Sequence, residues 1–321
     1  MYKNLLYIIF PFFVLSPSCD APHTNPLDPQ NTDGNLAVIE GSVKSENIPR
    51  LPIPGVEIFW SNSNILDYSD ANGQFKIKNL IPKDGWLLLR KSGFSSDSLY
   101  ITWIDNKKIS IERYLNANPA LDSAIFSSIV VNKYPSNQKY SAEFRIKISD
   151  VENDIDSVII NNEELNFFHH LDYNLTTKFY EDLLSLNELN INSLDEIIGK
   201  NFQIIALDKE EEEFSVGDIS LKRIIKQEIV TISPAGRDTV EVDSIVFKWL
   251  RFNPGFEFNY QIQVYTDEIP AELVWERQLP SSEIEFRLDI SLTSGDYFWV
   301  IWGIDEFYNK SRSKPFSFII K

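Results

Sequence analysis

The sequence has few of the residues on which small exported domains and many enzymes depend. Among 321 residues there are one cysteine, one methionine and three histidines. A single cysteine excludes an intrachain disulfide, so each domain must be stabilised by its own hydrophobic core. After the N-terminal stretch, no apolar run approaches the roughly twenty residues that a membrane-spanning helix needs. With 43% apolar and 13% aromatic residues, the chain has enough apolar material for two or three globular domains.

Catalytic groups are scarce. The sequence contains no Gly-Xaa-Ser-Xaa-Gly, no His-Glu-Xaa-Xaa-His and no glycine-rich phosphate loop. His169 and His170 are adjacent, so on a strand they face opposite ways; a zinc site with Asp172 is one hypothesis, and solvated loop residues are the preferred one. A hydrolase with paired carboxylates stays an alternative, although small sandwiches without a deep cleft are poor hosts for it. We therefore expect no enzyme.

Positive charge is also in short supply. Lys and Arg number 30 against 47 Asp and Glu, which gives a net charge of −17. This balance argues against electrostatic binding of nucleic acid or of anionic lipid head groups. It is compatible with a domain body held away from a surface.

The first residues carry a targeting pattern. Lys3 precedes an apolar run from Leu5 to Leu15, and small residues lead to Cys19, the only cysteine. This start resembles a bacterial lipoprotein signal over residues 1–18, with Ser16 where the usual pattern prefers Leu. The resemblance implies that Cys19 is lipidated and anchors the protein to a membrane. The alternative is a lone cysteine that happens to lie near a cleavage site.

Residues 19–35 are rich in Pro, Asn and Asp and have no hydrophobic period, so they predict a flexible tether. Within them, the run Asn-Pro-Leu-Asp-Pro at 25–29 is similar to the segment that often follows the lipidated cysteine in Bacteroidetes-type outer-membrane lipoproteins. The implied location is the cell envelope, lipid-anchored, at the outer membrane.

From residue 36 onward, short alternating runs separated by turn residues predict an all-β chain of three tandem sandwiches. In residues 36–118, strands are expected at 38–43, 56–60 and 86–90, with a tight hairpin at Asn72-Gly73. The order of Gly41-Ser42-Val43, Pro54-Gly55-Val56, the 70–77 run, Leu80 and Lys91-Ser92-Gly93-Phe94 resembles the carboxypeptidase regulatory-like domain. That resemblance implies a transthyretin-like sandwich without catalytic residues.

For residues 119–226 the pattern predicts an Ig-like sandwich with a short helical insertion. Strands are expected at 142–148, 158–160 and 202–206. Helical features extend over 181–198, where Ser193 and Glu196 form a plausible capping box and Gly199 a stop.

Residues 227–321 predict a third sandwich. Leu292, the turn at Gly295 and Tyr297 at the start of a strand resemble the tyrosine corner of fibronectin type III domains, in which the phenol bonds back to the chain before the turn. A weak internal echo aligns Ala206-Leu207-Asp208 with Gly303-Ile304-Asp305. It favours two related sandwiches in tandem.

Two loops of the middle domain suggest a cation hypothesis. In an Ig-type sandwich the loop at 150–156 and the hairpin at 208–213 lie at the same end. The carboxylates that would converge suit a hard cation such as Ca²⁺, and they are Asp150, Glu152, Asp154, Asp156 and Asp208. The alternative, which we prefer, is a set of acidic turns in an acidic chain.

The corresponding loops of the last domain carry aromatics. Phe252, Phe256, Phe307 and Tyr308 are candidate ligand contacts that could stack on a sugar or an apolar partner. Packing between the second and third domains is the alternative, and we prefer it. The function that the sequence favours is a non-catalytic binding or spacer module at the envelope, in contact with protein or glycan and without a cofactor. The alternative is a carbohydrate-binding accessory lipoprotein of an outer-membrane nutrient uptake system.

Overall fold

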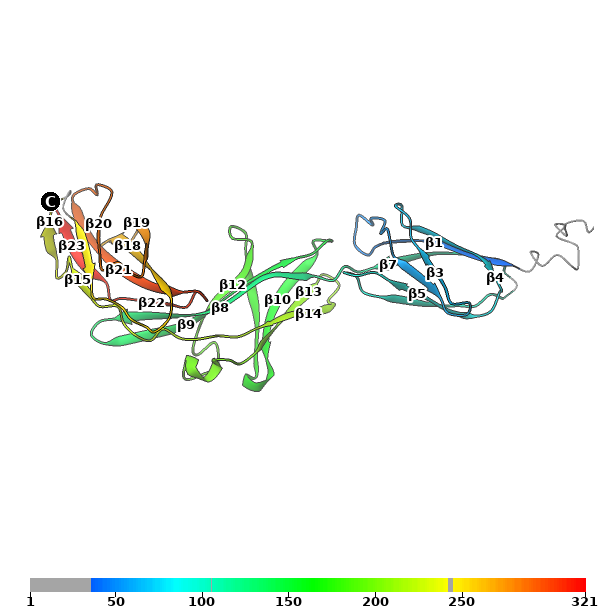
Figure 1. Ribbon diagram of the computed structural model, residues 1–321, viewed down its shortest axis with the longest axis horizontal. Helices are drawn as coiled ribbons and strands as arrows, with labels where there is room; N and C mark the ends of the chain where they lie inside the picture. The colour runs from blue at the N-terminus through cyan, green and yellow to red at the C-terminus, as the bar shows by residue number, and fades with distance from the viewer. Residues whose placement is uncertain (1–35, 105, 242–244) are drawn as a thin grey trace, which may run out of the picture. The chain divides into compact units, whose positions relative to one another are not determined.

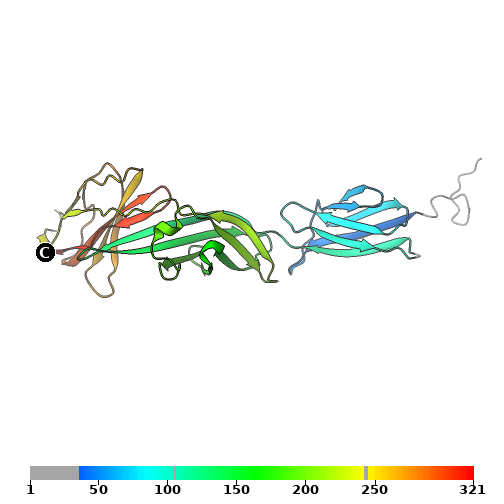
Figure 2. The ribbon, with the colours of Figure 1, turned by 90° about the horizontal axis from the view of Figure 1, so that it is seen from below.

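The computed structural model describes residues 36–104, 106–241 and 245–321, and the predicted signal peptide (1–18), Cys19 and the tether (19–35) lie outside them. The chain divides into two compact units between Asn116 and Ala117. Within the described ranges there are many strands, two short 3-10 helices and no α-helix (Figures 1 and 2). None of these helices has the length and apolar character to cross a bilayer. The predicted all-β fold class is confirmed.

Unit 1 is a sandwich of two sheets. One sheet has the order β4 (Gln74–Leu80), β1 (Ala37–Ser45), β7 (Lys108–Leu115). The other has the order β3 (Ile65–Tyr68), β2 (Glu57–Trp60), β5 (Gly85–Arg90), β6 (Asp97–Ile101). Alternate residues point inward, and the core includes Ile39, Trp60 and Leu87, all fully buried.

The Asn72-Gly73 turn differs from the prediction. It does not close a hairpin between paired strands, because β3 and β4 belong to different sheets and the turn passes from one to the other. The Asp70 carboxylate accepts the N–H groups of Asn72 (2.8 Å) and Gln74 (2.9 Å). Gly73 has φ +71°, and a Cβ built there would lie 2.4 Å from the carbonyl oxygen of Val43. The Asn-Gly pair correctly indicated a positive φ but could not indicate which strands the turn joins.

Unit 2 begins with seven strands around one core. Along the sheet their order is β14-β13-β10-β11-β12-β9-β8. Their bounds are β8 (Ala120–Lys133), β9 (Asn137–Ser149), β10 (Ile155–Asn162), β11 (Phe167–Asn174), β12 (Phe179–Ser185), β13 (Phe202–Asp208) and β14 (Glu213–Ile219). The sheet curves until Gly217 of β14 lies against Leu121 of β8. Phe126, Phe144 and Phe202 fill the space that it encloses.

The helical insertion is shorter than predicted. Residues 181–185 form the end of β12, where the chain pairs with β9. Only η3 (Leu194–Ile197) is helical in this segment, as one 3-10 turn, and η2 (Glu163–Leu165) precedes β11. The capping box of Ser193 and Glu196 is confirmed, and Gly199 takes φ +74° directly after it. Pairing with β9 overrides the local helical pattern of 181–185.

The C-terminal part of unit 2 has the strand order of a fibronectin type III sandwich. One sheet is β15 (Thr231–Ser233), β17 (Val246–Trp249), β20 (Glu285–Arg287). The other contains β19 (Leu273–Pro280), β18 (Phe258–Thr266), β21 (Gly295–Asp305), β22 (Lys310–Arg312) and β23 (Phe316–Ile320), with β16 (Asp238–Val240) parallel to β23. The tyrosine corner is confirmed: the Tyr297 hydroxyl donates to the carbonyl of Thr293 at 3.0 Å.

A strand pairing joins the two parts of unit 2 into one sheet. β22 runs parallel to β8, with Lys310 opposite Ile129 and Arg312 opposite Val131. Asn309, fully buried, accepts the N–H (2.8 Å) and the hydroxyl (3.0 Å) of Ser128 on its side-chain oxygen. Two hydrophobic cores therefore share one compact unit, and the expected boundary at 226/227 does not separate compact units.

Candidate binding surface

One sheet of unit 1 has apolar side chains on its solvent side. The inner residues of β2 and β5, such as Ile58 and Leu87, are fully buried. The alternate residues of β2 and β5, together with the residues opposite them on β3 and β6, point outward. They form what we call the aromatic face: Phe59, Leu66, Tyr68, Trp86, Leu88 and Tyr100. Isolated exposed apolar residues are ordinary, but a contiguous group on a flat sheet indicates a contact surface.

Trp86 and Tyr100 are the most prominent members of this face. They lie opposite each other on β5 and β6, with ring centroids 5.2 Å apart in an edge-to-face arrangement. Their exposed fractions are 49% and 51%. Such a pair offers a large and rigid contact area at a low cost in side-chain entropy. Glu57 and Arg90, opposite each other in register, are the charged residues that border the face on β2 and β5.

Two continuous apolar runs in the sequence indicate this face, although the prediction for these segments is an ordinary strand with one buried side. Residues 58–60 and 86–89 are continuous apolar runs, whereas a strand with one solvated face should alternate. A continuous run means that both sides of the strand avoid water. Because the described residues of unit 1 cover only one side of these strands, the outer side is available to a partner.

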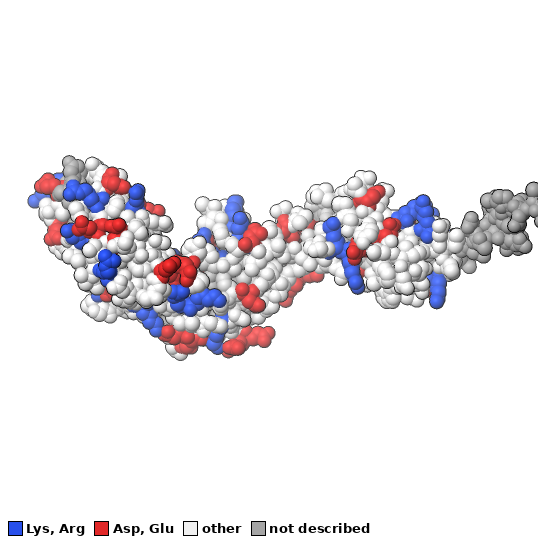
Figure 3. All heavy atoms as spheres, in the orientation of Figure 1, with Lys and Arg blue, Asp and Glu red and all other residues white. Residues whose placement is uncertain are grey.

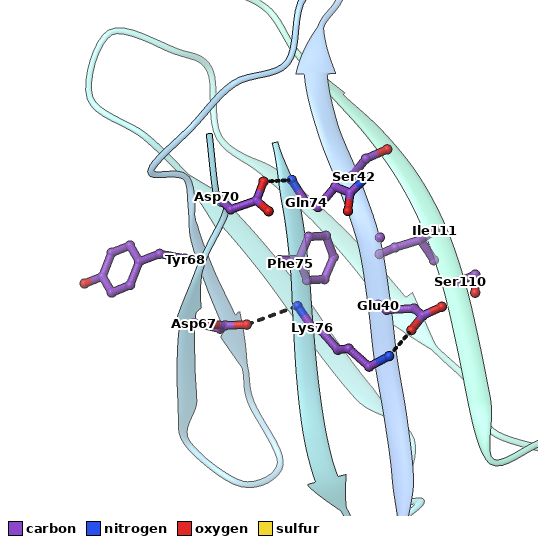
Figure 4. A pocket seen from close by; sticks show the side chains of 11 residues that line it. Glu40, Ser42, Asp67, Tyr68, Asp70, Gln74, Phe75, Lys76, Ser110 and Ile111 are labelled. Atoms are coloured by element: carbon purple, nitrogen blue, oxygen red, sulfur yellow. Dashed lines mark hydrogen bonds and ion pairs between the residues drawn. The ribbon is translucent and has the colours of Figure 1, made fainter. Parts of the chain in front are cut away.

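A shallow pocket of about 610 Å³ lies at the open edge between β3 and β4 (Figure 4). Glu40 on β1 pairs there with Lys76 (2.7 Å) and Lys108 (2.5 Å). The bonds from these two lysines lower the pKa of Glu40 to about 2. The charge of Glu40 is thus compensated by two lysines, whereas the Asp67 and Asp70 carboxylates of the same pocket accept backbone N–H groups.

Carboxylates also cap the free edge of β4. Asp67 accepts the N–H of Lys76 at 3.2 Å, and Asp70 accepts that of Gln74 (Figure 4). Occupied amides cannot pair with an added strand, so this edge is protected against β-augmentation. Binding by unit 1 is therefore better placed on the aromatic face than at this edge.

The acidic loops of the middle part lie side by side, since the N–H of Lys209 donates to the carbonyl of Asp154 at 3.0 Å. Asp150 and Asp208 use their carboxylates within their own turns, each accepting N–H groups two and four residues later. Glu152 accepts the N–H of Ala117 at 2.8 Å.

Asp156 lies near Tyr180, whose pKa is raised mainly by burial and further by Tyr173 and Asp156. In the described part of the chain, no group of three or more His, Cys, Asp or Glu is arranged to hold a metal ion. Of the residues in the Ca²⁺ hypothesis, Asp150, Glu152 and Asp208 use their carboxylates to accept backbone N–H groups.

Asp154 is the exceptional carboxyl of this region. It is 4% exposed, and burial raises its pKa to about 7, with further contributions from the neighbouring Asp150 and Glu152. Two carboxylates this close cannot both ionise without mutual repulsion. The carboxyl is therefore partly protonated at neutral pH.

Stability is expected to fall as the pH rises from about 4 to about 7. Between the ordinary aspartate pKa of the unfolded chain and the raised pKa of folded Asp154, the folded state binds more protons, so removing protons favours unfolding. Thermal unfolding at several pH values measures this slope. Asp154→Asn should remove part of it, because the amide does not titrate, and an unchanged slope would contradict the assignment.

The candidate loop aromatics lie at the contact between the two cores of unit 2. Phe252 is 3% exposed and belongs to the last core, and Phe256 packs against that core. The Arg223 guanidinium lies over the rings of Phe256 (4.5 Å) and Phe307 (4.9 Å), and its side chain pairs with Asp305 at 3.4 Å. Tyr308 is 56% exposed. This geometry agrees with the packing interpretation for Phe252, Phe256 and Phe307.

The side chains of His169 and His170 have different surroundings. His169 stacks near Phe167 and contacts the Asp182 carboxylate at 2.9 Å, whereas His170 lies against Phe168. Asp172 gives its backbone N–H to the same Asp182 carboxylate at 3.3 Å. These contacts account for the residues of the zinc hypothesis as parts of the β11–β12 pairing.

No protein-family model and no curated protein matches the sequence. Among solved structures, similarity is found to the fibronectin(III)-like modules of Clostridium thermocellum CbhA (11% identity, TM-score 0.30, 63% of this chain and 92% of that chain). The FN1–FN3 domains of chicken CNTN1 give 9% identity and a TM-score of 0.33, over 83% and 91% of the chains. BcpA, the major pilin subunit of Bacillus cereus, has 12% sequence identity and a TM-score of 0.25. The match covers 89% of this chain and 95% of BcpA. The strand order and the tyrosine corner define the fold of the C-terminal sandwich.

Proposed function

We propose that the protein is a non-catalytic binding module of the cell envelope, anchored through lipid on Cys19, that contacts a protein partner with the aromatic face of unit 1. The observation that carries the binding role is the group of six apolar side chains on the outer side of β3-β2-β5-β6. Aliphatic and aromatic residues are mixed there, and charged residues border them. Protein interfaces have this arrangement, with an apolar centre and a polar rim.

The anchor is supported by the resemblance of residues 1–19 to a lipoprotein signal. Its check is the intact mass of protein purified from membranes. The mass should correspond to a chain beginning at Cys19 plus acyl groups, and Cys19→Ala should abolish both the added mass and the membrane association.

The role of the aromatic face is tested by photo-crosslinking in cells with a reactive amino acid at position 100. We expect one discrete protein adduct, reduced about tenfold by Trp86→Ser, because large aromatics at the centre of an interface carry most of its binding energy. Melting temperature should change little, since Trp86 is half exposed.

A matched control places the same reactive residue at Tyr134 of unit 2, which is 58% exposed. The same adduct from both positions would indicate non-specific capture. No adduct at position 100, or one that Trp86→Ser leaves unchanged, would contradict the proposal.

A glycan is the second candidate ligand for this face, because the exposed Trp86–Tyr100 pair could stack on a sugar ring. That reading corresponds to a carbohydrate-binding accessory lipoprotein. It predicts polysaccharide binding that Trp86→Ser and Tyr100→Ser each weaken, with no protein adduct in the crosslinking experiment.

A further inference from the structure

The guanidinium of Arg312 forms no ion pair with a carboxylate of the described residues. Arg312 ends β22, directly opposite Trp302 of β21, on the outer side of the last sheet. Its Nε is buried without a hydrogen-bond acceptor. In a chain with 47 acidic residues, acids for such a pair are abundant. A buried donor without an acceptor lowers the stability of the folded state. A functional role, such as binding a ligand, would explain why it is present.

The two lysines nearest to Arg312 in the sequence do have acidic partners. Lys310 pairs with Glu143 at 3.4 Å, and Lys314 pairs with Glu228 at 3.2 Å. Each of these lysines therefore has its charge matched across the junction. Burial lowers the pKa of Arg312, and the Tyr265 hydroxyl is the titratable group that acts on it. The guanidinium is still charged at neutral pH, because arginine titrates far above it.

The surroundings of Arg312 are rigid and aromatic. Its guanidinium lies 5.9 Å from the centroid of the Trp302 ring. The Trp302 indole N–H (2.8 Å) and the Tyr265 hydroxyl (2.9 Å) both donate to the side-chain oxygen of Gln263. Tyr265 is also stacked on Phe298, with centroids 5.1 Å apart. The rings are thus held in place before any ligand arrives, which reduces the entropy lost on binding.

A polar group on an adjoining strand can accept hydrogen bonds from the hydroxyl groups of a ligand. Glu276, exposed on β19, accepts bonds from Gln261 (3.1 Å) and Gln263 (3.2 Å), and both end on Oε2. A carboxylate has further lone pairs on its second oxygen. A cation, fixed indole and phenol rings, and hydroxyl acceptors therefore follow one another across the outer side of β22, β21, β18 and β19.

We propose that Arg312, Trp302 and Tyr265 form a subsite for the carboxylate of an acidic sugar, a hexuronate within an oligosaccharide. The guanidinium pairs with the carboxylate through two parallel N–H···O bonds, for which its planar fork is suited. The sugar ring lies against Trp302, and hydroxyls of the next residue reach Glu276. This subsite is in unit 2 and does not depend on the aromatic face of unit 1.

The test is titration calorimetry of the intact chain with a galacturonate trimer and with its methyl ester, which has the same shape and no charge. We expect saturable binding of the acid and binding of the ester about ten- to a hundredfold weaker, because a hydrogen-bonded charge pair is lost. This comparison needs no variant, so it stands even if a substitution impairs folding. Equal binding of acid and ester, or binding of neither, would overturn the proposal.

Two variants locate the effect. Arg312→Gln should weaken binding of the acid to the level of the ester and should not lower the melting temperature, because it removes an unmatched buried donor. Arg277→Gln is the matched control: it lies on β19, pairs with Asp289 at 3.5 Å, and changes the net charge equally. Equal losses for both variants would mean non-specific attraction. A poly-glutamate peptide that binds while the uronate trimer does not would reject the sugar and assign the subsite to an acidic peptide.

Discussion

Alanine at position 73 is expected to destabilise unit 1 by about 3 kcal/mol or more. Gly73 has φ +71°, where an L side chain is strained, and its added Cβ would lie 2.4 Å from the carbonyl oxygen of Val43 and 3.1 Å from the N–H nitrogen of Ile53. Both of these are backbone atoms and cannot turn aside as a side chain could. The turn between β3 and β4 would therefore have to open, and with it the connection between the two sheets.

Gly93→Ala is the control for this experiment. Gly93 also has a positive φ, +81°, but an added Cβ there meets nothing within 4 Å. Gly93→Ala should lower the free energy of unfolding by about 1 kcal/mol, which is the cost of holding alanine in the left-handed conformation. Urea unfolding followed by tryptophan fluorescence measures both. If the two substitutions cost the same, the close approach to Val43 contributes nothing and the explanation is wrong.

Asn309→Ala is expected to uncouple the two cores of unit 2 at a cost of about 3 kcal/mol. The side chain of Asn309 is fully buried and accepts two bonds from Ser128, and its amide donates to Asp305 at 3.0 Å. Alanine would leave the N–H of Ser128 without this acceptor inside the junction. Calorimetry should then resolve a separate transition for the C-terminal sandwich.

The matched control is Asn253→Ala, an exposed asparagine of the same sandwich. It should leave the melting profile unchanged, because surface substitutions of this kind have small effects. A single unchanged transition in Asn309→Ala would show that the β8–β22 pairing and the Arg223 contacts hold unit 2 together without this side chain.

Features encoded within a few residues were predicted well. The tyrosine corner depends on Tyr297 and the carbonyl of Thr293, and the capping box on Ser193 and Glu196. In both, the bonding partners are close in sequence, so their spacing alone is informative. The same holds for the strands whose alternating residues face one core.

One local motif recurs in a form that the sequence only partly revealed. Asp70, Asp150, Asp208 and Asp305 each accept backbone N–H groups two and four residues later. In every case the residue three positions on has a positive φ: Gly73, Asn153, Glu211 and Tyr308. The echo between Asp208 and Asp305 is thus a shared turn. Tyr308 occupies the left-handed position of its turn, and its exposure follows from that.

Features that depend on distant segments were not predictable. The pairing of β22 with β8 joins residues about 180 positions apart, and β22 is only three residues long. The aromatic face requires knowing which side of β2 and β5 is covered. Arg312 is noticeable only through the absence of an acid nearby, which no single-sequence pattern reports. Burial and pairing of this kind are properties of the folded chain.

The pairing of β8 with β22 has a mechanical consequence. The chain enters unit 2 at Ala117 and runs directly into β8, while β22 leads through β23 to the C-terminus at Lys321. The two strands are parallel, so a pull on the two ends of the unit draws them in opposite directions along their length. Their hydrogen bonds are then loaded in shear and must fail together instead of one after another. At the C-terminal end β23, which is paired with β21 and β16, carries the same pull.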